Sequence, residues 1–145
     1  MKRIAFALLL LLAPGGAAAQ IEGRPTPGGC ISVAGVHARV AASGRPKLRS
    51  FPGPPNYESV AGGDSEERVF ILELPGPVCI DDGGDFADPS ERFRTVHVAG
   101  DDEQARAALR GAIGRRVTVS GDGFASFTGH HHAPLVILAD RVVVH

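Results

Sequence analysis

Three consecutive histidines, His130, His131 and His132, are the side chains of this 145-residue chain best suited to chemistry. They lie between Thr128 and Pro134 and make up half of the six histidines in the sequence. In an extended backbone His130 and His132 point to one side and His131 to the other, because side chains alternate. Imidazole titrates near neutral pH, so the run has the chemistry of a metal ligand or of a general acid or base.

A metal site is one interpretation of the run, with His130 and His132 as ligands. Zinc takes three or four protein ligands, so a further one must come from elsewhere, and the candidates are His37, His97, Asp122 or a residue of the proline-rich segment described next. Two alternatives stay open: the histidines support the structure, stacking on Phe51 or Tyr57, or they contact a ligand directly. We expect no cofactor unless zinc or another divalent metal binds here.

The longest segment without a strand or helix pattern, Ser43 to Glu67, is rich in proline and glycine. Its centre reads Phe-Pro-Gly-Pro-Pro-Asn-Tyr-Glu-Ser over residues 51–59 and carries the single tyrosine. A loop longer than about 15 residues inside a compact domain is uncommon and is usually functional or disordered. The prolines restrict this one, so we expect an ordered loop that binds a ligand together with the histidine run, through Phe51, Asn56, Tyr57, Glu58, Thr128 and His131.

Catalysis is the least favoured interpretation. Ser59 and Ser126 lie outside any Gly-x-Ser-x-Gly elbow, the turn that presents a nucleophilic serine in many hydrolases. Glu58 could form an acid–base pair with a histidine, but only its residue type suggests this pair, since no motif links the two. We therefore expect a protein that is not an enzyme.

Residues 1–19 have the pattern of a secretory signal peptide. Lys2 and Arg3 form a basic start, an apolar run follows, and three alanines end the segment before Gln20. The apolar run is shorter than the ~20 residues that span a bilayer, so cleavage is favoured over an uncleaved anchor. We expect an exported protein, located in the periplasm or outside the cell.

The mature chain has the size of one domain. Residues 20–29 form a flexible lead-in rich in proline and glycine, and residues 30–145 form the domain. Removal of Lys2 and Arg3 from the 15 basic residues leaves 13, against 16 acidic ones. Binders of nucleic acid or anionic membranes show a basic surplus, so we expect neither partner, no stable membrane insertion after cleavage, and a monomer.

Two cysteines, Cys30 and Cys79, remain after export. An even count in an oxidising compartment favours a disulfide, and two buried free thiols are the alternative. The two do not form a Cys-x-x-Cys pair, which argues against redox catalysis.

The predicted elements follow the order strand, long loop, strand, strand, helix, strand, strand. The strands are expected at 31–42, 68–74, 93–99, 116–127 and 135–144, and the helix at 101–113, with Asp101 as N-cap and Gln104 completing a capping box. This is the chain order of the OB-fold, a five-stranded Greek-key barrel, here with a helix between strands three and four. An antiparallel α+β sheet or a sandwich is the alternative, because one sequence does not fix strand pairing.

An OB-fold brings together its loops between strands one and two and between strands four and five. Those loops here contain residues 51–59 and 128–134, so we expect a site between them. The acidic stretch 81–89 lacks the spacing and the closing glutamate of a calcium loop, which indicates a solvated surface turn.

Several motifs carry a family resemblance: the nine residues at 51–59 with Gly63-Asp64 and a glutamate after them, Pro77-Val78-Cys79, and Thr-Gly-His-His-His at 128–132 with Pro134. Together they resemble the bacterial family known as domain of unknown function 4431. The resemblance covers about residues 30–140, and it implies a small exported protein with an OB-like barrel and a paired-cysteine framework. Ala133 departs from it, since a polar residue is common there, as does Asp122-Gly123. It implies no activity.

The sequence thus predicts a small exported bacterial protein that binds an unidentified ligand or protein of the cell envelope, without catalysis, through residues 51–59 and 128–134. A periplasmic metal-binding protein that uses His130 and His132 is the first alternative. A hydrolase is the remote one.

Overall fold

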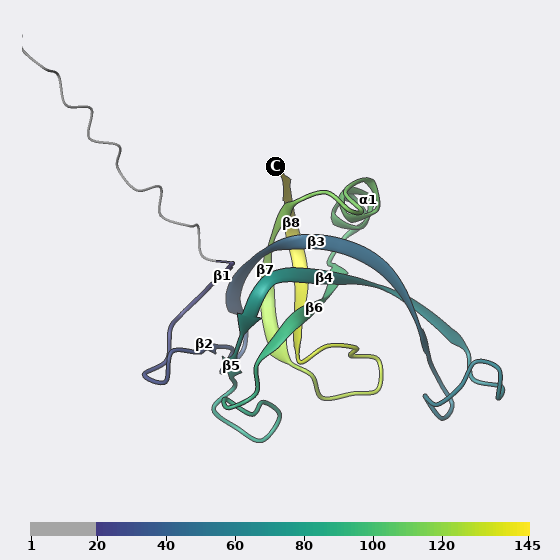
Figure 1. The fold of residues 1–145 in the computed structure, drawn as a ribbon, viewed down its shortest axis with the longest axis horizontal. Coiled ribbons are helices and arrows are strands. Elements are labelled where there is room, and N and C mark those ends of the chain that lie inside the picture. The colour runs from purple at the N-terminus through teal and green to yellow at the C-terminus, as the bar shows by residue number, and fades with distance from the viewer. Residues whose placement is uncertain (1–19) are drawn as a thin grey trace, which may run out of the picture.

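The structure, a computed structural model, describes residues 20–145, and the predicted signal peptide at 1–19 lies outside the described residues. The chain is mainly β with one short helix, as predicted (Figure 1). Its elements in chain order are β1 (Ile21–Glu22), β2 (Ile31–Ser32), β3 (Ala38–Pro52), β4 (Glu66–Val78), β5 (Ile80–Asp81), β6 (Phe93–Gly100), α1 (Glu103–Gly111), β7 (Val117–Ala125) and β8 (Leu135–Val144).

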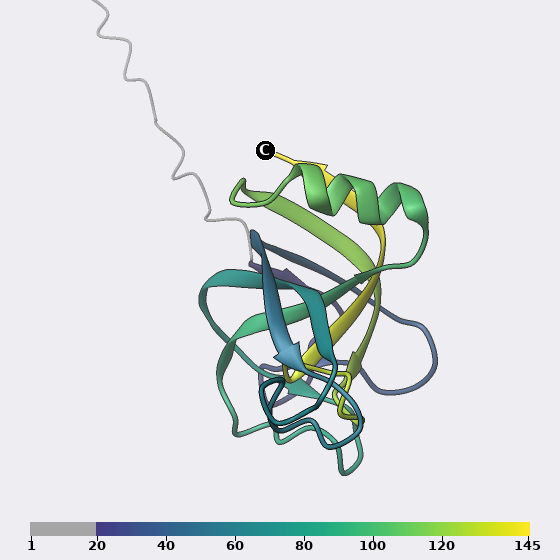
Figure 2. The same cartoon turned by 90° about the vertical axis from the view of Figure 1, so that its right-hand side faces the viewer.

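Five of these strands close a ring of hydrogen bonds. The main sheet has the order β1-β3-β4-β6-β8-β7, and a further pairing joins β7 back to β3 (Figure 2). Neighbouring strands are antiparallel except β6 and β8, which run parallel. The sheet is therefore mixed, because the connection through α1 and β7 returns the chain to β6 in the same direction.

Alternation along the strands places one face of each inside the ring. Each ring strand contributes a side chain with at most 3% of its surface exposed: Val40, Leu72, Val96, Val119 and Ile137. Leu109 of α1 is fully buried against the same cluster, and Figure 2 shows the helix lying across one end of the strands. Burial of each such valine or leucine contributes about 1.5–3 kcal/mol.

The first ring strand begins later than the sequence indicated. Ile31–Ser32 form only the short β2, which pairs with β5, and β3 begins at Ala38. Between them Gly35 and His37 have φ of 84° and 60°, left-handed conformations that are incompatible with a continuous strand. The predicted strand at 31–42 is therefore wrong in its first half.

The same strand continues into the stretch predicted as a long loop. Residues 38–44 pair with β7, and residues 45–52 then pair with β4. This second half of β3 pairs with β4 on one side only, within the described chain. On its other side the backbone N–H groups form no hydrogen bonds to a strand, so a proline, which lacks an N–H, is tolerated there. The loop predicted at 43–67 is reduced to residues 53–65, the proline loop.

Two irregularities explain other differences from the prediction. Pro75-Gly76-Pro77 was expected as a turn but lies within β4, where the register with β6 shifts between Glu73 and Val78. On β8, Arg141 pairs with Ser120 and Ala139 with Gly121, so the residue between them is left over as a bulge. In a bulge two residues of one strand lie opposite one residue of its neighbour, so the extra residue is left unpaired and the strand continues beyond it.

The helix begins two residues later than expected. Asp102 rather than Asp101 is the N-cap, and its Oδ1 accepts a 2.7 Å hydrogen bond from Ala105 N. The predicted capping box with Gln104 is therefore wrong by one position. Gly114 lies beyond the last turn at φ 78°, where a residue with a side chain is strained. Within residues 20–145, no helix is both long and apolar enough to cross a membrane.

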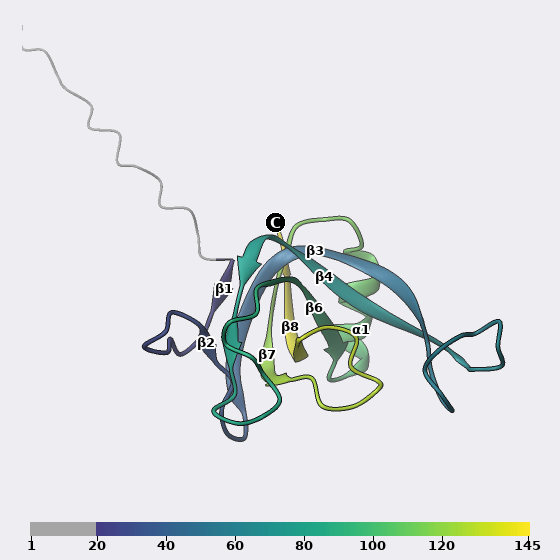
Figure 3. The ribbon, with the colours of Figure 1, turned by 60° about the horizontal axis from the view of Figure 1, so that its bottom comes forward.

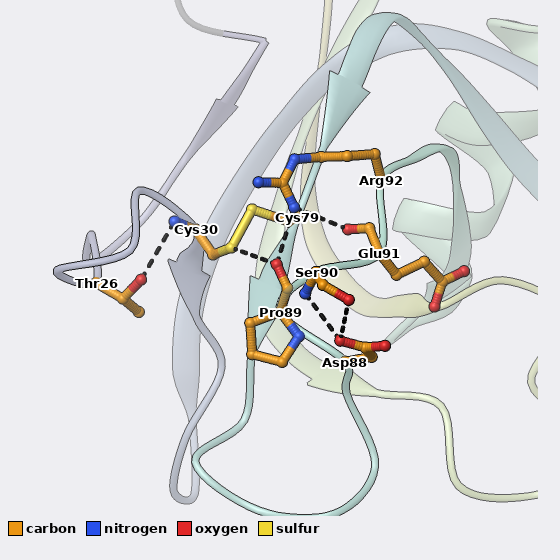
Figure 4. Close-up of a disulfide and its surroundings, with 8 residues drawn as sticks. All are labelled: Thr26, Cys30, Cys79, Asp88, Pro89, Ser90, Glu91 and Arg92. Atoms are coloured by element: carbon orange, nitrogen blue, oxygen red, sulfur yellow. Dashed lines mark hydrogen bonds between the residues drawn. A yellow bond between two sulfur atoms is a disulfide. The ribbon is translucent and has the colours of Figure 1, made fainter.

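Cys30 and Cys79 form a disulfide, as predicted (Figure 4). The bridge spans a sequence separation of 49 residues, and closing a loop of this length stabilises a fold by about 4 kcal/mol on the chain-entropy model. Ile31 N donates to Cys79 O at 3.0 Å, which continues the link into the β2–β5 pair. Cys30 Sγ lies 3.3 Å from the carbonyl oxygen of Pro89, so the bridge also supports the segment before β6.

Three loops lie at the end of the ring opposite α1 (Figures 1 and 2). They are the proline loop, the acidic loop at 82–92 and the histidine loop at 126–134. Figure 3 turns this end toward the viewer. The histidine loop lies between the other two and contacts the proline loop through Tyr57 and the acidic loop through Phe86.

Candidate functional site

One carboxylate, that of Glu67 at the start of β4, joins β4 to the histidine loop. His132 Nε2 donates to Glu67 Oε2 at 2.8 Å, and His130 Nδ1 donates to Glu67 Oε1. The ring nitrogens that face the carboxylate carry the protons, because an ionised carboxylate only accepts hydrogen bonds. Both carboxylate oxygens of Glu67 are used, and 18% of its side chain is exposed. Hydrogen bonds to an ionised group of this kind are among the stronger ones in proteins. We refer to Glu67, His130 and His132 as the Glu67 bridge.

Tyr57 extends the bridge to the tip of the proline loop. Its hydroxyl donates to His130 Nε2 at 2.9 Å, and its ring meets the imidazole edge-on, with centroids 5.3 Å apart. Tyr57 has φ 60°, a strained backbone that persists where the surroundings fix it. At Gly129 an added Cβ would lie 3.0 Å from ring carbons of Tyr57, so a larger residue there would require the tyrosine ring to shift by a few tenths of an ångström.

Phe51 and His132 form a stacked pair beside the bridge. Their rings are nearly parallel, at 6°, with centroids 4.2 Å apart. Beneath them lies His97 of β6, whose Nδ1 accepts a 3.3 Å hydrogen bond from His132 N. His97 is flanked across the sheet by Ile71 and Val136, and all three are buried on the outer face of the ring. Phe51 of β3 and the histidine loop therefore cover a second, outer layer of the structure.

His131 points away from the Glu67 bridge, as the alternation predicted. Its Nδ1 accepts hydrogen bonds from Phe127 N at 3.0 Å and Thr128 N at 3.3 Å. Its ring packs edge-on against Phe127 and Phe124, with centroids 4.7 and 5.3 Å apart. Partial burial lowers the pKa of His131, and the nearby His130 adds to this effect. The neutral ring that results is the form that accepts both backbone bonds.

Asp64 organises the proline loop. Its two oxygens accept hydrogen bonds from Asn56 N, Glu58 N and Ser59 N, and a further one from Asn56 Nδ2. The backbone hydrogen bonds from Ser59, Glu58 and Asn56 lower the pKa of this carboxyl. Asp64 is buried, so it fixes the loop in one conformation and holds Tyr57 in position.

Burial and charge act in opposite directions in the bridge. Burial acts to raise the pKa of Glu67, but the hydrogen bonds from His132 and His130 outweigh it, and the pKa is lowered overall. Burial lowers the pKa of His97 to about 4, and the charges of His132 and His131 act in the same direction. At neutral pH the layer thus combines an anionic Glu67 with a neutral, buried His97.

A groove of about 400 Å³ opens beside the stacked pair on the outer face of β3, β4 and β6. Apolar surface comes from Phe51 and Ile71, and polar groups line the rest: Arg49, Ser50, Glu73, Thr95 and His132. Glu73 is held by Lys47 Nζ at 2.7 Å and by Arg49 at 3.1 Å. The groove therefore combines an aromatic surface with hydrogen-bonding groups of both signs.

The structure brings together some of the predicted site residues and not others. Phe51, Tyr57, His130 and His132 meet between the two loops. His131 faces the other way and packs on Phe127 and Phe124. Asn56 and Glu58 are exposed and contribute backbone donors to Asp64, and Thr128 is exposed beside His131. Of the further ligands considered for a metal, His97 contacts the bridge, whereas His37 pairs with Asp122 at 2.6 Å. In the part of the chain that the structure describes, no group of three or more His, Cys, Asp or Glu side chains is arranged to hold a metal ion.

Sequence reasoning missed the central role of Glu67 and Asp64. A signal for Glu67 was present, because continuing the alternation of the second strand backward places Glu67 on the same face as Val69 and Ile71. The signal for Asp64 was weaker. An acidic residue after two glycines is typical of a turn, but it does not show which backbone N–H groups the carboxylate accepts from.

The comparison with protein families gives one match. Residues 95–142, about a third of the chain, match the model of a family described as Domain of unknown function (DUF4431). The matched segment runs from β6 to β8, and it includes the histidine loop but not the proline loop. No curated protein and no solved structure matches the chain. The resemblance to this family is thereby confirmed for residues 95–142, where the chain carries a DUF4431 domain, and the motifs at 51–59 and 77–79 lie outside the match.

Proposed function

We propose that this protein is a non-catalytic binding module of the bacterial cell envelope, and that its ligand occupies the groove beside Phe51 and His132. The observation that carries the proposal is the Glu67 bridge, since it fixes the histidine loop to β4 at the rim of that groove, and Tyr57 joins the proline loop to it. A rigid, preformed wall lowers the entropic cost of binding. Export and a monomeric state, both expected from the sequence, complete the proposal.

We further infer that the five-strand ring is an OB-fold barrel. Taking β3, β4, β6, β7 and β8 as strands one to five, the pairings follow the order 1-2-3-5-4-1, with strands three and five parallel. OB-folds bind their ligands on the face of strands two and three, between the loops that join strands one to two and four to five. The groove lies on that face, beside the proline and histidine loops.

The bonding of the network supports binding rather than catalysis. Both nitrogens of His130 are engaged, one by Tyr57 and one by Glu67, and both oxygens of Glu67 are engaged. A general base needs a nitrogen that faces the substrate. Metal binding through Nε2 of His130 would instead require the hydrogen bond from Tyr57 to break, because the bonds to Glu67 use the other nitrogen of that ring.

The groove suits a sugar ring or a short peptide. Phe51 stacked on His132 gives an apolar surface, while Ser50, Thr95 and Arg49 supply hydrogen-bonding groups around it. Ligand sites in proteins combine an apolar wall with a few convergent polar groups in this way. Soluble fragments of the cell-wall glycan and its attached peptides are therefore the probes of choice.

The test is a titration of the mature protein with such fragments, followed by amide chemical shifts in NMR. We expect the largest shifts at Arg49, Ser50, Thr95 and His132, and an affinity at least about tenfold lower in Phe51→Ala, the loss typical of a central aromatic contact. Val36→Ala, an apolar truncation at a side chain that is 87% exposed, is the matched control.

Two results would overturn this proposal. One is the failure of every glycan and peptide fragment to shift these signals. The other is binding that Phe51→Ala leaves unchanged. Calorimetry with zinc, on wild type and on His130→Ala/His132→Ala, decides the metal alternative, which requires an affinity tighter than millimolar that the double variant loses.

A further inference from the structure

A second pocket lies on the other flank of the histidine loop, between that loop and the acidic loop. It has a volume of about 310 Å³. Its floor is apolar and comes from the buried side chains Ile80, Phe93 and Ala133. None of the residues of the Glu67 bridge lines it, so it is separate from the groove described above.

Exposed aromatic rings stand at the edge of this pocket. Phe86 lines it and is 66% exposed, and Phe127 is 57% exposed. Their centroids lie 5.9 Å apart, and Phe124 continues the row at 5.7 Å from Phe127. Large apolar side chains that gather on a surface in this way mark interaction sites more often than isolated ones do.

The rim of the pocket is negatively charged. Asp88 and Glu91 line it, and the stretch from Asp81 to Glu91 contains five acidic residues and no basic one. In Figure 4 the carboxylate of Glu91 points away from the disulfide and that of Asp88 faces Ser90, whereas the guanidinium of Arg92 extends toward the disulfide. Arg92 donates to the carbonyl oxygens of Pro89 and Glu91 and does not line the pocket. Its positive charge is therefore not paired with the carboxylates of Asp88 and Glu91.

We propose that this pocket binds a lysine or arginine side chain of a partner peptide segment, with an apolar residue next to it. The apolar floor suits the methylene stem of such a side chain, which packs on apolar surface while its charge stays at the rim. Asp88 and Glu91 supply the opposite charge, and Phe86 offers its ring face to a cation. Charge complementarity thus selects a cationic segment over a neutral or acidic one.

The test uses three synthetic peptides that differ at one position, acetyl-Gly-Leu-Xaa-Leu-Gly-amide with Xaa as lysine, norleucine or glutamate. In NMR titrations of the mature protein, we expect the lysine peptide to shift the amide signals of residues 86–91 and 133–134. Norleucine, which keeps the stem and removes the charge, should bind at least fivefold more weakly. Glutamate should not bind.

Variants of the protein locate the charge effect. Glu91→Gln and Asp88→Asn should each lower the affinity for the lysine peptide about three- to tenfold, and Asp88→Asn keeps an oxygen for the bonds from Ser90. Asp85→Asn, an exposed change in the same loop that does not line the pocket, should leave it unchanged. Raising the salt concentration to 0.5 M should weaken binding of the lysine peptide and not of the norleucine peptide.

Three results would overturn the proposal. The first is equal binding of the lysine and norleucine peptides, which would make the pocket a plain apolar groove. The second is the absence of shifts at residues 86–91 with the lysine peptide up to millimolar concentration. The third is a doubling of mass with concentration that Phe86→Ser abolishes, which would assign the surface to a second copy of the chain. Because Phe51→Ala does not touch this pocket, the result is independent of the proposed envelope ligand.

Discussion

The inside and the outside of the ring are built from neighbouring residues of the same strands but are stabilised in different ways. Leu72, Val96 and Ile137 face inward, and Ile71, His97 and Val136, the residues beside them, face outward. The inner set belongs to the apolar core cluster. Above the outer set lies the histidine loop, which a single carboxylate, Glu67, ties to β4 and which Tyr57 joins to the proline loop.

Because of this difference, we expect the stability of the inner apolar layer and that of the outer layer to respond to different perturbations. Contacts between apolar side chains do not depend on pH, and they are lost through cavities. Charge-assisted bonds to Glu67 depend on protonation, and their loss frees the loops rather than the strands. Each of the following changes is designed to affect one layer and leave the other intact.

The largest effect is expected from the inner layer. Leu72→Ala removes a fully buried side chain from the centre of the ring and should lower the free energy of unfolding by about 2–5 kcal/mol. Urea unfolding followed by circular dichroism measures it. Leu138→Ala, at a side chain that is 39% exposed, is the control and should cost far less. Equal losses in the two variants would show that the ring interior is not the stabilising core.

An intermediate effect is expected at the bridge. Glu67→Ala leaves the donors of His130 and His132 without their acceptor and should lower the free energy of unfolding by about 1–3 kcal/mol. Its signature is local: hydrogen exchange should become faster in the proline and histidine loops and stay unchanged in β7. Glu66→Ala is the neighbouring control, since its partner is only Ser50. Uniformly faster exchange over the whole ring would contradict the separation of the layers.

The smallest effect is a dependence of the outer layer on pH. The pKa of His97 is about 4 in the folded protein against about 6.5 in the unfolded chain. The unfolded state therefore binds the proton more readily, and stability is lost as pH falls from about 6.5 toward 4. Between pH 6.5 and 4.5, above the range where Glu67 is protonated, we expect Tm to fall by about 5 °C.

His97→Asn should flatten this pH profile, because an asparagine oxygen accepts from His132 N and does not titrate. The comparison is between slopes, so a change in the absolute stability of the variant does not matter. His37→Asn, at a side chain that is 77% exposed, should keep the slope of the wild type. An unchanged slope in His97→Asn would assign the pH dependence to other groups.

The inner layer was predictable from the sequence and most of the outer layer was not. Alternation located β4 and β7, because a strand with one buried face shows it in every second residue. A continuous apolar run, as in a strand buried on both faces, located β8. Alternation failed for the second half of β3, which is rich in arginine and proline and pairs with β4 on one side only. Its apolar residues therefore do not recur at every second position. The meeting of the two loops followed from the order of elements. The partner of the histidines did not, because the carboxylate of Glu67 lies more than 60 residues away in sequence.

The closure of the ring through β3 and β7 also determines when the chain can fold. Ser43 and Thr118, which share a hydrogen bond between these strands, are separated by 75 residues, and contacts of such range make folding slow. A chain that emerges from its N-terminus can form the β3–β4 hairpin early, but the first half of β3 lacks its partner until β7 appears. The ring of the nascent protein therefore stays open until most of the chain has been made.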